Sequence, residues 1–112
     1  MLALTVLMDI ELENKFKNAK DALDIVIAEL KSIDSGNWIK YFLEMEQCIS
    51  QKNVECLVNA RDAVPMVNMG GFLEFLEVHP ALSKAHNNLS TTIGNLKIYH
   101  RYQVSRELVD LS

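Results

Sequence analysis

The sequence has few of the residues that interrupt regular structure, with only two prolines and four glycines among 112 residues. This scarcity argues against a disordered or proline-rich chain, and no internal repeat or low-complexity tract is visible. Apolar residues nonetheless make up 49% of the chain, which is enough to build one core without disulfides or a metal ion. We therefore expect a single domain over residues 1–112, with a radius of gyration of about 13 Å if it is compact.

Cysteine is also scarce, because Cys48 and Cys56 are the only two. Their separation of eight residues fits no zinc or redox motif, and two cysteines make a poor disulfide framework. The sequence therefore predicts free, buried thiols in a reducing cytosol.

No apolar run is long enough to cross a membrane, since the longest, Leu2 to Met8, ends at Asp9. It lacks a basic region before it and a small-residue cleavage site after it. We expect a cytoplasmic protein without membrane contact.

Motifs that carry chemistry are absent too, including a phosphate-binding loop and a nucleophile elbow. His86 and His100 would share a helical face, but about 21 Å apart, so they predict no metal site. Glu44 and Glu46 would point about 200° apart on a helix, which does not suit paired acid–base catalysis. We expect no catalytic residue, cofactor or metal, and we expect the histidines to be surface residues or satisfied residues at the core edge.

The chain does contain a strong helical pattern near its start. Apolar residues alternate at spacings of four and three, which is typical of a helix that buries one stripe: Leu12, Phe16, Ala19, Leu23, Val26, Leu30 and Ile33. A first helix from about Ala3 to Ile33 follows. The pattern fails upstream of Leu12, and length favours a break near residues 11–14, although the upstream residues could instead bury a different face.

Further helices are predicted along the rest of the chain. A second one, over about residues 37–50, would begin at a cap from Ser35 or Asn37. Asn53 would cap a third helix that Pro65 ends. Residues 72–77 form a short helix or a strand, and Pro80 suits the first turn of a last helix, with a break at residues 87–88 left open. These elements predict an all-α fold, a compact bundle of four to five helices with short connections.

The net charge of −4 is unevenly distributed. Residues 1–77 carry 13 acidic against 7 basic residues, whereas residues 78–112 carry 2 against 4. The acidic part argues against a nucleic-acid partner, which needs a basic face. It is compatible with a basic protein partner.

The segments Asn-Trp-Ile-Lys-Tyr-Phe from Asn37 and Asn-Met-Gly-Gly-Phe-Leu-Glu-Phe from Asn68 resemble a family of small bacterial helical proteins. That family carries an early tryptophan and a later Gly-Gly-Met-Gly-Ser-like turn, from which this chain departs by lacking the second methionine and the serine. Its members look like immunity proteins of contact-dependent growth inhibition. The resemblance implies a cytosolic antitoxin without enzymatic activity.

The resulting hypothesis is an immunity protein that binds a cognate secreted toxin domain, expected to be a basic nuclease, and occludes its active site. Acidic residues from the first two-thirds of the chain would supply the contacts: Asp34, Glu44, Glu46, Glu55, Asp62, Glu74 and Glu77. The alternative is a helical adaptor or a homodimerising module without a toxin partner.

Overall fold

The computed structural model describes residues 2–33, 36–67 and 71–111. These residues form five helices and, within these ranges, no strand. The helices are α1 (Leu2–Ser32), α2 (Gly36–Ser50), α3 (Val54–Asp62), α4 (Phe72–Glu77) and α5 (Pro80–Leu111). The predicted all-α fold is confirmed, and the strand alternative for residues 72–77 is wrong.

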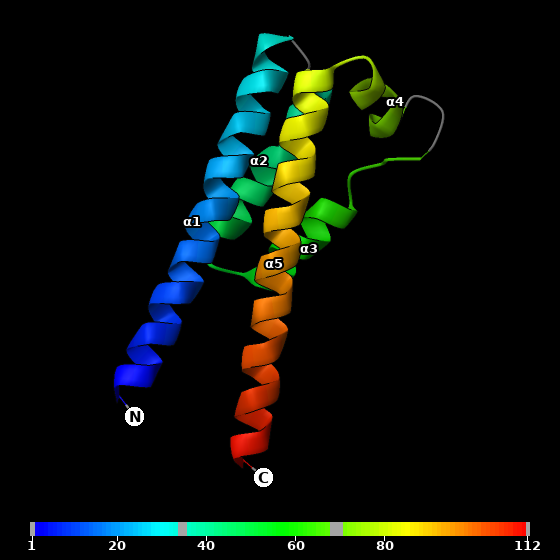
Figure 1. Ribbon diagram of the computed structural model, residues 1–112. Coiled ribbons are helices and arrows are strands. Elements are labelled where there is room, and N and C mark those ends of the chain that lie inside the picture. Colours follow the sequence, from blue (N-terminus) through cyan, green and yellow to red (C-terminus); the bar gives the residue numbers. More distant parts are fainter. Residues whose placement is uncertain (1, 34–35, 68–70, 112) are drawn as a thin grey trace.

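Two long helices, α1 and α5, run side by side for much of their length, with both chain ends at the same end of the molecule (Figure 1). Each is continuous, so neither the break that length favoured in the first helix nor the one left open at residues 87–88 occurs. The molecule therefore measures 50 × 24 × 20 Å, and its radius of gyration of 16.0 Å exceeds the value expected for a compact chain. The long helices make it elongated.

The core lies between these two helices and the shorter α2 and α3, which pack together on one side of the pair (Figure 1). Most of the predicted stripe of α1 is buried, with Leu23, Val26 and Leu30 fully inaccessible to solvent. Leu12 and Ile33, at the ends of that stripe, are only partly buried. The spacing of apolar residues therefore identified the buried face correctly.

An aromatic cluster attaches α4 to the rest of the fold. The ring of Phe72 on α4 lies 4.9 Å from Trp38 and 5.5 Å from Phe42, both on α2. Such tilted pairs add to the apolar burial of the rings. Trp38 itself is only partly buried. The helix that carries it begins at Gly36, so Asn37 lies inside it and is not the predicted cap, while Ser35 lies outside the described residues.

Gly94 offers a simple test of α5. It lies inside the helix, and a Cβ built on it meets no atom within 4 Å. Because glycine gives the unfolded chain extra freedom, we expect Gly94→Ala to raise the free energy of unfolding by about 1 kcal/mol. Urea unfolding followed by Trp38 fluorescence measures this change, with Ala85→Gly as the opposite control. A loss of stability in Gly94→Ala would contradict the open space around this position.

Candidate functional site

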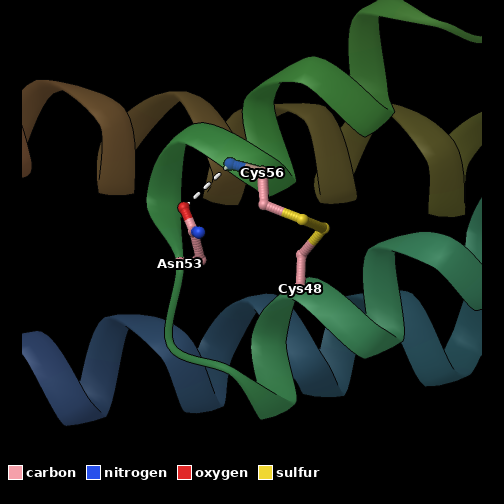
Figure 2. The surroundings of a disulfide bond; sticks show 3 residues. All are labelled: Cys48, Asn53 and Cys56. Carbon is pink, nitrogen blue, oxygen red and sulfur yellow. Dashed lines mark hydrogen bonds between the residues drawn. A yellow bond between two sulfur atoms is a disulfide. The ribbon is translucent and has the colours of Figure 1, made fainter.

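Helix α3 is short, and its start is determined by three local features. The side-chain oxygen of Asn53 accepts a hydrogen bond of 3.0 Å from the backbone N–H of Cys56, which confirms Asn53 as the predicted cap (Figure 2). Lys52 precedes it with φ 55°, a left-handed conformation that reverses the chain after α2. The third feature is covalent, because Cys48 of α2 is joined to Cys56 of α3.

This disulfide shows that the prediction of free thiols was wrong. The turn brings the two Cα atoms to 5.5 Å, within the usual range for a disulfide. The spacing of eight residues alone does not predict a disulfide, because the two cysteines come close only when α2 and α3 pack as a hairpin. The bond also bears on location, since stable disulfides are typical of oxidising compartments and rare in the cytosol.

The outer surface of α3 is polar. Its buried side holds Val54, Leu57 and Ala60, and the opposite side presents Glu55, Asn59 and Asp62, all exposed. These three lie four and three residues apart, so they form one stripe along the helix. We call this stripe the α3 ridge.

A groove lies on each side of the α3 ridge. The α2–α3 groove has a volume of about 510 Å³, and the α3–α5 groove has a volume of about 450 Å³. Asn59 lines both, so the ridge is the wall between them. A protruding segment of a partner protein could therefore bind in the groove on either side of α3.

The two grooves differ in charge. In the α3–α5 groove Glu55 and Asp62 share the lining with Lys97, His100 and Arg101. The α2–α3 groove contains one acid, Glu44, among amides and small residues. Asp62 also accepts a hydrogen bond of 3.2 Å from Arg61 Nε. Around these two grooves, the negative charge therefore lies on the ridge and on α2, and the positive charge lies on α5.

The structure brings together only some of the seven predicted contact residues. Glu44, Glu55 and Asp62 line the grooves beside α3. Glu46 is half-buried and lies on the opposite flank of α2, because two helical residues subtend about 200°. Glu74 and Glu77 are exposed on α4, away from these grooves, and Asp34 lies outside the described residues. Of the seven predicted contact residues, only Glu44, Glu55 and Asp62 therefore lie together beside α3.

His86 is a polar group that sequence reasoning misjudged. It was expected to be satisfied or exposed, but it is buried with only 8% of its surface accessible, and its Nδ1 has no hydrogen-bond partner. The rings of Phe42 and Phe72 lie edge-on at 6.2 and 5.2 Å. It lines a cavity of about 440 Å³ together with Arg61, Asp62 and Ser90. Burial lowers the pKa of His86 below its usual 6.5.

This burial predicts a pH dependence of stability. The folded protein keeps His86 neutral where the unfolded chain begins to bind a proton, so stability is lost as pH falls from about 6.5 toward the lowered pKa. We expect a loss of up to about 1.4 kcal/mol per pH unit from this one group. Urea unfolding at about pH 7.5 and about pH 5.5 measures how the free energy of unfolding changes with pH. In His86→Leu this change should be smaller by the contribution of the histidine. Equal slopes in the two proteins would contradict it.

Other kinds of site receive no support from the described residues. Among them, no three His, Cys, Asp or Glu side chains are grouped so that they could hold a metal ion. In the same part of the chain, no helix has both the length and the apolarity needed to cross a bilayer.

Comparison with known proteins identifies no relative. No family model, curated protein or solved structure matches this chain. The resemblance to immunity proteins therefore stays a prediction, and the function has to be inferred from the α3 ridge and its grooves.

Proposed function

We propose that this protein works by binding another protein and that it neutralises a cognate secreted toxin domain by covering its active site. The observation that carries the proposal is the α3 ridge, where Glu55 and Asp62 stand exposed between two grooves and Glu44 lies across one of them. Exposed acids beside grooves suit a partner with a protruding basic segment, since complementary charge speeds association and selects the partner. A nuclease domain is basic around its substrate cleft, because it must bind phosphates, so it carries the positive charge that these acids would attract.

Neutralisation in the producing cell is the direct test. A toxin domain encoded beside this gene, expressed alone, should stop growth, and co-expression of the full 112-residue chain should restore it. Failure to restore growth with a stable, well-expressed chain would reject the proposal for that toxin. The growth test is made in a host whose cytoplasm permits disulfides to form, because the structure contains the Cys48–Cys56 bond and such bonds are rare in an ordinary cytosol.

One observation favours homodimerisation as a second candidate. Ile98 and Tyr102 lie four residues apart on α5 and are 68% and 60% exposed, so they form a small apolar strip on one helical face. Light scattering at increasing protein concentration distinguishes the candidates. If the protein is a monomer and rescues growth, the result supports toxin neutralisation. If it is a dimer that Tyr102→Lys dissociates, the result supports a homodimerising module without a toxin partner.

A further inference from the structure

We propose that the Cys48–Cys56 disulfide is a reversible two-electron switch that controls whether α3 is held in place. The effect of the switch on partner binding rests on the proposed function, but the switch itself does not. Its elements are a disulfide that is partly accessible at Cys56, a short helix joined by it, and a groove that leads to it.

Besides this bond, helix α3 is held by its packing against α2 and α5. It contains nine residues, whereas isolated helices shorter than about 12–15 residues are marginal in water. Only Val54, Leu57 and Ala60 of the helix are buried. The disulfide and the Asn53 cap both act at its first turn (Figure 2). Loss of the bond should therefore loosen α3 while the long helices α1 and α5 stay folded.

The α2–α3 groove gives a small thiol a route to the bond. Both cysteines line this groove, and Cys56 is only partly buried while Cys48 is almost fully buried. A thiolate entering the groove would therefore attack Cys56 Sγ and release Cys48 as the leaving thiolate. Glu44 on the same groove disfavours reductants with additional negative groups, so the expected reagent is a dithiol whose only charge is that of the attacking thiolate.

The chemistry balances as thiol–disulfide exchange with a dithiol. The first thiolate of the dithiol forms a bond to Cys56 Sγ, the Cys48–Cys56 bond breaks, and Cys48 takes up a proton. The second thiol of the reductant then attacks the mixed disulfide and releases Cys56. Two electrons and two protons pass from the dithiol, which becomes a cyclic disulfide, to the two cysteines.

Reduction would alter the α3 ridge because the ridge is the outer face of the same helix. Glu55 lies next to Cys56, and Asn59 and Asp62 follow within two turns. A loosened α3 no longer presents these side chains in one stripe. The oxidised protein would then bind the partner and the reduced protein would bind it more weakly.

Hydrogen exchange of the full chain, oxidised and after treatment with dithiothreitol without denaturant, tests the switch. We expect amides of residues 54–62 to exchange about 50-fold faster after reduction, and buried amides of α1 and α5 to change less than about threefold. The variant Cys48→Ser/Cys56→Ser should match the reduced protein and ignore dithiothreitol. Mass analysis after thiol alkylation confirms the redox state of each sample.

Three results would overturn the switch. These are unchanged exchange in α3, equal acceleration in α1, α3 and α5, and a bond that resists dithiothreitol until denaturant is added. Partner binding is scored separately with the toxin domain of the growth test. If α3 loosens on reduction but the protein binds the toxin domain in neither redox state, only the proposed function is rejected. If it binds equally well in both states, the switch stands and only its effect on binding is rejected.

Discussion

Reversing the two ridge charges together, Glu55→Lys/Asp62→Lys, should weaken binding to the toxin domain about 100-fold, mainly through slower association. Both side chains are exposed and line the α3–α5 groove, and the reversal replaces attraction to a basic partner with repulsion. The fold should persist, because the Arg61–Asp62 pair is largely solvated at Asp62 and such pairs contribute only about 0–1 kcal/mol. Surface plasmon resonance gives both rate constants.

A matched control separates local from overall charge. Glu11→Lys/Glu77→Lys changes the net charge equally, at exposed residues of α1 and α4 that line neither groove beside α3. We expect this variant to bind within about threefold of the wild type, apart from the general loss of steering at low salt. If both double variants weaken binding equally, the ridge is not the contact surface and only the net charge matters.

Truncating Leu23 to alanine should lower the free energy of unfolding by about 3 kcal/mol. Leu23 is fully buried in α1, and the change leaves a cavity between the long helices and α2. Urea unfolding with Trp38 fluorescence should show a lower midpoint and an unchanged dependence on urea concentration.

Ile25 provides the control for this truncation. It lies two residues further along the same helix and is 52% exposed, so we expect Ile25→Ala to change stability by less than about 0.5 kcal/mol. Similar losses in the two variants would contradict the assignment of the buried stripe of α1.

The helices could be predicted from the sequence because their signals are local. The spacing of Phe16, Leu23 and Leu30 identifies a buried stripe, and all three are buried. Asn53 as a cap and Pro80 at the start of α5 follow from backbone chemistry alone. Continuity of α1 was misjudged because helix length is only a statistical guide. Packing against α5 along much of its length supports a longer helix than isolated segments can sustain.

The candidate site depended on tertiary packing and was predicted only in part. Nothing in the sequence shows that Glu44 and Glu55 line grooves beside the same helix while Glu77 lies elsewhere. The disulfide was missed for the same reason, because it requires the reversal at Lys52 and the packing of α3 on α2. The unpaired Nδ1 of His86 depends on two phenylalanine rings from other helices. Each of these features arises from contacts between separate elements, which no local pattern in the sequence reveals.

Calorimetric titration of the oxidised protein into the catalytically inactivated toxin domain encoded beside its gene tests the central claim most directly. At about 50 mM salt we expect a one-to-one complex with Kd below about 100 nM, weakened at least about 10-fold at about 300 mM salt. An absence of binding at about 100 μM protein, or an affinity that neither salt nor reversal of Glu55 and Asp62 changes, would contradict the account.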